Sequence, residues 1–191
     1  MNIGIILGST RKGRLGERVA KWAVSRLQLQ EGVEAQLVDL ADYSLPFYEQ
    51  AEQPFQITGD YQSPVANQWR DTINGLDGFI IVNPEYNHGY SAVLKNALDY
   101  LYYPWVDKPV LFISYSNGVI GGARAVEQLQ EVILHLGMVR SGALHIGKAQ
   151  EVFSEAGEVL AGPFDQLLDK QLEPLLEWTE ILNQKRAKKD R

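Results

Sequence analysis

The chain contains no cysteine among its 191 residues. Disulfides, thiolate catalysis and cysteine-bound metals are therefore excluded, and any redox chemistry must use a bound cofactor. Histidine is scarce as well, with three residues that are scattered and lack paired carboxylates, so no metal site is predicted. We interpret His135 and His145 as structural, because they fall in an expected helix and an expected strand. For His88, a turn and a cofactor contact both remain open.

Long apolar runs are also missing. The longest, at 78–82 and 109–113, are far shorter than the roughly 20 residues that cross a bilayer. The chain does not begin with a basic region followed by an apolar run, so we expect no signal peptide. Together with the absence of cysteine, this predicts a cytoplasmic protein with no membrane association.

Basic residues are few outside one short segment. Five of the 18 lysines and arginines lie in 185–191, so residues 1–184 carry 13 basic and 23 acidic groups, a net charge of −10. A body of this charge is repelled by a phosphate backbone, and nucleic-acid binding is not expected. The length predicts one domain over 1–184. We expect 185–191 to be a solvated, frayed basic tail, with a tail contact as the alternative.

Short apolar runs alternate with helical patterns. Strands are expected at 2–7, 34–40, 78–82, 110–114 and 143–146. Apolar stripes predict helices around 19–27, 65–76, 94–101, 126–133 and 168–182. This alternation favours an α/β fold with a flavodoxin-like, doubly wound five-stranded parallel sheet in the order 2-1-3-4-5. The stretches 41–62 and 147–163 are expected to be irregular surface excursions.

In such a sheet a ligand binds beyond the carboxyl ends of the strands where the strand order reverses, here between the first and third strands. Three loops at this edge, 8–16, 83–91 and 116–122, concentrate glycine, asparagine, serine and charged residues. The first combines glycines and hydroxyls with three cations at the start of a helix, which favours a phosphomonoester. The other two have glycines that allow close approach of a flat heterocycle. A plain structural turn remains the alternative for the first two loops, and the signal of the third depends on its lying at the same sheet edge as the others.

Other phosphate and hydrolase motifs fail. Walker A requires Lys and then Ser or Thr after its second glycine, where this chain has Arg14 and Leu15. The three glycines of the dinucleotide fingerprint are absent at their fixed spacing, although Asp39 lies where a ribose-binding acid would. A G-x-S-x-G nucleophile elbow follows none of the expected strands.

Two segments of the chain are similar to the NADPH-dependent FMN reductase family, which includes bacterial quinone, chromate and azo-dye reductases. They are Gly8-Ser9-Thr10-Arg11 through Val19-Ala20, and Pro84-Glu85-Tyr86-Asn87 through Leu94-Lys95-Asn96-Ala97-Leu98-Asp99. With Gly121-Gly122-Ala123-Arg124 in register, the resemblance spans about residues 1–146. The chain departs from it at three positions: many relatives have serine at position 14, asparagine at position 16 and proline at position 91.

The resemblance implies FMN as cofactor and NADPH or NADH as co-substrate. The residues that it implies around the phosphate are Ser9, Thr10, Arg11, Arg14, Leu15 and Gly16. Those that it implies beside the isoalloxazine ring are Pro84, Glu85, Tyr86, Asn87, His88 and Gly89, with Ser116, Asn117 and Gly118 at the pyrimidine side. No catalytic side chain is implied, since the flavin N5 accepts the hydride and the cofactor carries the chemistry.

The function implied is an FMN-dependent NAD(P)H oxidoreductase that passes electrons to a small acceptor, which could be a quinone, an azo compound, a metal oxyanion or free flavin. Relatives are often homodimers or homotetramers, and we expect the same here. A flavodoxin-type electron carrier is the alternative. The cations of the first loop argue against it, because carriers usually hold the phosphate with neutral groups, whereas Tyr86, Tyr90 and Tyr115 favour it. An interaction protein of the same fold with an empty or regulatory site is a third possibility.

Overall fold

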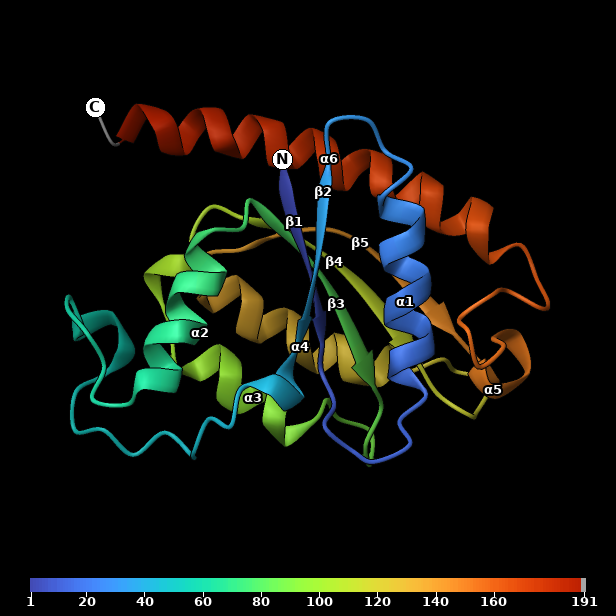
Figure 1. Cartoon of the computed structure of the whole chain (residues 1–191), viewed down its shortest axis with the longest axis horizontal. Helices are drawn as coiled ribbons and strands as arrows, with labels where there is room; N and C mark the ends of the chain where they lie inside the picture. Colours follow the sequence, from blue (N-terminus) through green and yellow to red (C-terminus); the bar gives the residue numbers. More distant parts are fainter. Residues whose placement is uncertain (190–191) are drawn as a thin grey trace.

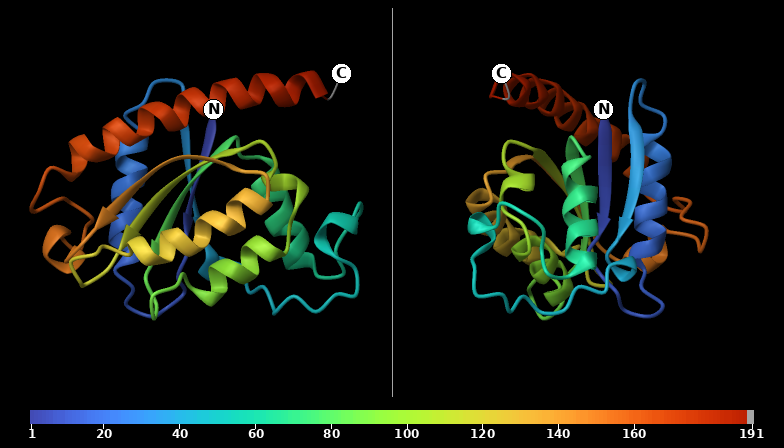
Figure 2. Two further views of the ribbon diagram at one scale, coloured as in Figure 1. Left: turned by 180° about the vertical axis from the view of Figure 1, so that it is seen from behind. Right: turned by 60° about the vertical axis from the view of Figure 1, so that its left-hand side comes forward.

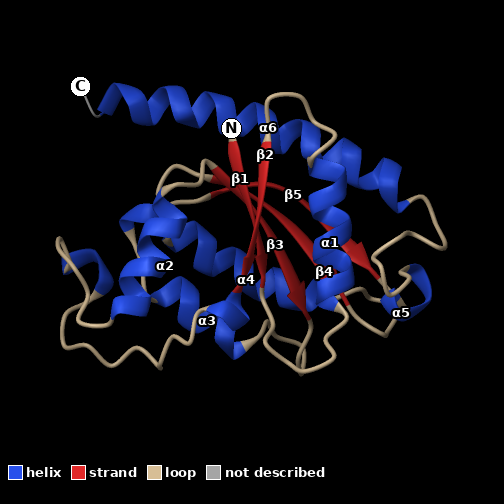
Figure 3. Ribbon diagram, viewed as in Figure 1, coloured by secondary structure: helices blue, strands red, loops and turns tan. Residues whose placement is uncertain are grey.

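A computed structural model describes residues 1–189. It contains a parallel sheet in the order β2-β1-β3-β4-β5 (Figures 1 and 3), as predicted. The strands are β1 (Asn2–Leu7), β2 (Glu34–Asp39), β3 (Gly78–Pro84), β4 (Pro109–Tyr115) and β5 (Val139–Ile146). The two continuous apolar runs form β3 and β4, which are buried along their whole length. The strands with more polar residues, β2 and β5, lie at the edges.

Helices cover both faces of the sheet, as the right-hand view of Figure 2 shows. On one face lie α1 (Gly16–Leu27) and α6 (Phe164–Lys189), and on the other lie α2 (Pro64–Asn74), α3 (Ala92–Asp99) and α4 (Ala123–His135). Because side chains alternate along a strand, Phe79 and Ile81 enter the core under α2, α3 and α4, whereas Ile80 and Val82 enter the core under α1 and α6. The sheet therefore has two apolar cores and is covered on both faces.

The two irregular stretches hold short elements that the sequence did not predict. Residues 41–62 include the end of η1 (Leu40–Asp42) and all of η2 (Pro54–Gln56). Residues 147–163 contain α5 (Ala149–Val152), and η3 (Tyr103–Trp105) precedes β4. As expected, both stretches lie outside the sheet (Figure 1).

The basic segment at the end of the chain differs from the expected frayed tail. Residues 185–189 complete the last turns of α6, and residues 190 and 191 lie outside those that the structure describes. Lys185 Nζ lies 2.7 Å from Asp107 Oδ1, and Arg186 Nη2 lies 3.5 Å from Asp77 Oδ1. Two of the five basic residues therefore bind turns at the amino-terminal ends of β3 and β4.

Lys108, beside these turns, is buried with 6% of its surface exposed. Its Nζ donates hydrogen bonds of 2.7 Å to the carbonyl of Ile73 and 3.3 Å to that of Asn74, at the carboxyl end of α2. Burial lowers the pKa of Lys108 to about 8, and the charge of Arg186 lowers it further, against a smaller opposite effect of Asp77. The lysine thus adds a donor to carbonyls at the end of the helix, where the regular i+4 backbone donors run out.

Candidate functional site

The loops after β1, β3 and β4 meet at one edge of the sheet, at the bottom of Figure 3. They enclose a cavity of about 520 Å³, a size typical of small-molecule sites. Its walls are formed by Arg11, Gly13, Arg14, Leu15, Arg18, Pro84, Glu85, Tyr86, Tyr115, Ser116, Asn117, Gly118 and Gln150. The strand order reverses between β1 and β3, so the cavity lies where the fold predicts a ligand.

The first loop joins β1 to α1 and is anchored by buried polar groups. Ser9 is fully buried, and its hydroxyl lies 2.7 Å from that of Tyr86. Ser91, at the start of α3, caps that helix by accepting from the backbone N–H of Leu94 and donates its own hydroxyl to the carbonyl of Gly8. These bonds fix the base of the first loop to the second loop and to α3.

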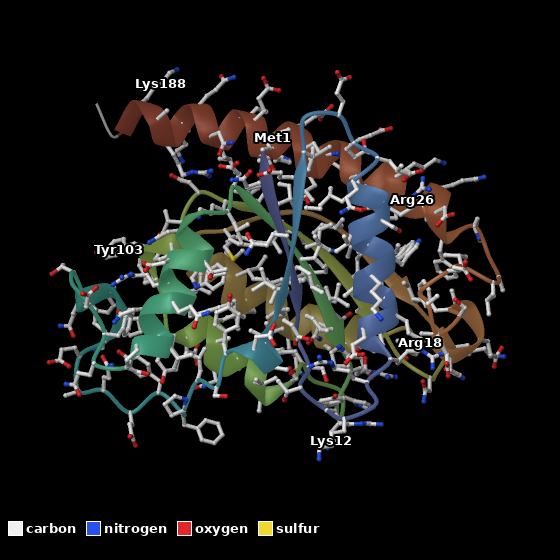
Figure 4. The ribbon with its side chains drawn as sticks, in the orientation of Figure 1. Met1, Lys12, Arg18, Arg26, Tyr103 and Lys188 are labelled. Atoms are coloured by element: carbon white, nitrogen blue, oxygen red, sulfur yellow. The ribbon has the colours of Figure 1, made fainter. Side chains whose placement is uncertain are left out.

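Cations of the first loop fall into two groups. The side chains of Arg11 and Lys12 form no hydrogen bond or ion pair within residues 1–189, and Figure 4 shows Lys12 at the tip of the loop. Arg14, in contrast, is bound on three sides: to Asp39 at the end of β2, to the Ser9 carbonyl, and to Glu17 at 3.1 Å. Its side chain is 9% exposed. Arg14 therefore braces the loop, while Arg11 and Lys12 keep their charge available to an anion.

The second loop ends in a tight turn. Tyr86 and Gly89 exchange backbone hydrogen bonds of 2.8 and 3.0 Å, and Asn87 and His88 between them have φ of 49° and 69°. Positive φ at both central residues is typical of a two-residue hairpin turn. Because both side chains are exposed and neither lines the cavity, this geometry favours the turn for His88.

Glu85, at the base of this turn, has a hydrogen-bond partner for only one of its two carboxylate oxygens in the described part of the chain. Arg124 Nη1 donates to Glu85 Oε1 at 3.1 Å, whereas Oε2 is buried without a partner in the described part of the chain. Asn83 Oδ1 is likewise buried and unpartnered there. Buried acceptors without donors are costly. Glu85 lines the cavity, so a ligand N–H or O–H would satisfy its free oxygen.

The third loop is held against the segment that follows β5. Lys148 donates its backbone N–H to the carbonyl of Gly118 at 3.0 Å, and Ala149 donates to that of Ser116 at 3.1 Å. Gly121 and Gly122 have φ of 65° and 83° and pack against β5 and β4 respectively. These contacts present the backbone of 116–118 to the cavity.

Nine of the fifteen residues expected at the site line this cavity, and six do not. Thr10 lines a neighbouring cavity, Ser9 is fully buried, Gly16 begins α1, and the remaining three, Asn87, His88 and Gly89, belong to the turn. The sequence reasoning also missed some lining residues, namely Gly13, Arg18, Tyr115 and Gln150. The position of Arg18 in the first turn of α1, the helix that follows the first loop, could have indicated it, because the first turn of such a helix faces the ligand.

Within residues 1–189, no group of three or more histidine, aspartate or glutamate side chains is placed to hold a metal ion. None of the helices in that range combines the length and apolar character needed to span a bilayer.

His145 is held by Ser114, whose hydroxyl lies 2.6 Å from Nδ1. Burial lowers the pKa of His145, and the charge of Arg140 lowers it further.

The model of the NADPH-dependent FMN reductase family matches residues 1–151. The chain belongs to this family. This match confirms the resemblance that the sequence motifs indicated. It also confirms the predicted class, an oxidoreductase that uses FMN and a reduced nicotinamide.

Named relatives agree with the family assignment. An NAD(P)H-dependent FMN reductase of Saccharomyces cerevisiae is 37% identical over 147 residues, which cover 72% of this chain and 76% of that protein. A quinone reductase of Escherichia coli K12 is 34% identical over 178 residues, covering 87% and 89%. Among solved structures, the NAD(P)H:acceptor oxidoreductase FerB of Paracoccus denitrificans aligns with a TM-score of 0.73 and 26% identity, over 94% of this chain and 97% of that one.

Proposed function

We propose that this chain passes electrons from NADPH or NADH through bound FMN to a small acceptor, with a quinone as the favoured class. The observation that carries the proposal is one cavity at the meeting point of three loops, lined both by Arg11, a cation without a carboxylate partner in the described chain, and by Glu85, whose Oε2 is buried and unpartnered there. FMN has matching ends: a phosphate and a flat ring that bears an N–H group. The residues present therefore fit the cofactor.

The phosphate end of the site is formed by the loop between β1 and α1. Arg11 and Lys12 supply positive charge that no carboxylate of the described chain neutralises, and the amino-terminal end of α1 adds the positive end of its helix dipole. Arg14 holds the loop in shape through Asp39. We assign Arg11 the main charge-assisted contact to the phosphate.

The ring end is formed by the second and third loops. Pro84, Glu85 and Tyr86 form one wall, and the backbone of 116–118 forms the other. Bound FMN supplies the redox chemistry, so the side chains have only to position the ring, accept its polar edge and leave one face open. No side chain is assigned a catalytic proton transfer.

A second cavity supports the acceptor class. It measures about 560 Å³, shares Arg11 and Tyr86 with the first, and is mostly apolar, with Leu45, Pro46 and Phe47 on one side. A flat, weakly polar molecule such as a quinone fits these walls better than a charged oxyanion does.

The proposal further includes a cytoplasmic location, one domain for the chain, and assembly into a homo-oligomer.

Anaerobic stopped-flow measurements test the proposal. NADPH should bleach the bound flavin without any acceptor, and a quinone should restore the colour after the pyridine nucleotide is removed. Steady-state kinetics should then be ping-pong, because both substrates use the same open face. If the flavin is bleached at a useful rate only when a separate reductase is added, the chain is an electron carrier. If the apoprotein binds no FMN at all, the assigned site is wrong.

A further inference from the structure

We infer that the Tyr115 hydroxyl is a hydrogen-bond donor to the FMN phosphate, and that Gly16 is glycine because this hydroxyl occupies the space of its side chain. The inference rests on the proposed function, since it concerns the same cofactor. It assigns a binding role to a strand residue outside the three loops.

The geometry around Gly16 carries the first step. A Cβ on Gly16 would overlap the phenol oxygen of Tyr115 and would lie 2.7 Å from Leu7 Cδ1. Gly16 is the first residue of α1 and is not among the residues with positive φ, so its backbone alone does not demand glycine. The missing side chain is instead required by the ring of Tyr115, which reaches from the end of β4 to the first turn of α1.

The hydroxyl of Tyr115 carries the second step. Tyr115 is 5% exposed, yet it lines the cavity, and no acceptor for its hydroxyl hydrogen is recorded within residues 1–189. Five other tyrosine hydroxyls have a partner within that range, those of Tyr43, Tyr48, Tyr61, Tyr86 and Tyr100. The Gly16 backbone N–H is hydrogen-bonded to the phenol oxygen, which leaves the hydroxyl hydrogen available. Because Tyr115 lines the cavity, a ligand there can supply the acceptor for that hydrogen.

The charges around Tyr115 favour a phosphate as that acceptor. Burial raises the pKa of Tyr115 far above its usual value, and Tyr86 raises it further, while Arg14, the Gly16 backbone and Arg11 lower it less. The phenol thus stays protonated and can donate. The first turn of α1 and the two arginines surround the same end of the cavity, and a neutral donor among such groups favours an anion.

Titration of the apoprotein with FMN and with riboflavin tests the inference, because riboflavin differs only in lacking the phosphate. We expect Tyr115→Phe to weaken FMN binding about 10-fold or more, with riboflavin binding unchanged. Tyr61→Phe is the matched control: it removes a buried hydroxyl that donates to the carbonyl of Tyr100, away from the cavity, and should leave both affinities unchanged.

A second variant tests the role of Gly16. Gly16→Ala should displace the phenol and reduce FMN affinity in the wild-type background, and it should reduce it less in the Tyr115→Phe background, where no phenol oxygen occupies the space. Circular dichroism establishes that each variant is folded before titration.

Each remaining outcome overturns the inference in a distinct way. Equal weakening of FMN and riboflavin means that Tyr115 holds the ribityl chain, the ring or the fold and not the phosphate. No change in either affinity means that the hydroxyl makes no ligand contact. If the losses of FMN affinity caused by the two substitutions are additive in the double variant, the space at Gly16 is not required by the Tyr115 hydroxyl. In these three cases the wild type still binds FMN and the proposed function stands, whereas a wild type that binds neither ligand overturns both proposals.

Discussion

Replacement of Gly121, in the third loop, by alanine should destabilise the fold for two separate reasons. Its φ of 65° lies in the left-handed region, which costs a residue with a Cβ about 1–2 kcal/mol. An added Cβ would also lie 2.7 Å from the Ile146 nitrogen and 2.8 Å from the His145 carbonyl carbon. These are backbone atoms of β5 and cannot rotate away, so overpacking adds about 1–3 kcal/mol. We expect Gly121→Ala to lower the free energy of unfolding by about 2–5 kcal/mol.

Gly32 is the matched control. Its φ is 72°, and an added Cβ would meet no heavy atom within 4 Å. Gly32→Ala should therefore lose only the backbone contribution, about 1–2 kcal/mol. Urea unfolding of the apoprotein, followed by the fluorescence of the fully buried Trp69 and Trp105, measures both variants. Equal losses in the two variants would refute the crowding argument, because they would show that the end of β5 moves aside freely.

Four further perturbations have defined outcomes. Arg11→Ala should weaken FMN binding by about 1.5–3 kcal/mol and leave riboflavin binding unchanged in apoprotein titrations; an equal loss for riboflavin would show that Arg11 supports the fold instead. Because burial lowers the pKa of Lys108 to about 8 from 10.5, the folded state binds fewer protons than the unfolded state between these values. The stability of the wild type relative to Lys108→Met should therefore rise by up to about 3 kcal/mol from pH 8 to pH 10.5 in urea titrations, and a flat difference would contradict this. Ser91→Ala removes the cap of α3 and the donor to the Gly8 carbonyl, and should cost about 1–3 kcal/mol in thermal unfolding; a loss below 0.5 kcal/mol would mean that water replaces both bonds. Phe47→Ala should raise the KM for a quinone about 10-fold without changing FMN affinity, and an unchanged KM would remove the second cavity from the acceptor site.

Local sequence patterns predicted the sheet because its inner strands are continuous apolar runs. The strand at 2–7 was predicted with its observed bounds, whereas β5 begins at Val139, before the predicted 143. Its first half contains Arg140, Ser141 and Gly142, which are polar or small because an edge strand is partly exposed. An apolar pattern in the sequence reveals only the buried residues of a strand, so the partly exposed first half of β5 was not predicted.

The position of the site was predictable from topology, but its internal pairings were not. Arg14 binds Asp39, 25 positions away, and a single sequence contains no signal for such a partner. Tyr115 was not predicted at the site because the glycine- and charge-rich pattern marks loops, whereas this residue ends a strand. The helical end of the chain was not predicted for a similar reason. Lys185 is held by Asp107, a partner 78 positions earlier that the sequence does not indicate.

The two edges of the sheet have a consequence for aggregation. An edge strand offers unpaired N–H and carbonyl groups to any other strand, and charge or irregularity at the edge discourages such pairing. Strand β2 carries Glu34 and Gln36 among its exposed residues, and β5 has a register irregularity opposite Val110 and Leu111. Both edges thus resist growth of the sheet by strand addition. Association of copies of this chain is therefore expected to use helices and loops and not the strand edges.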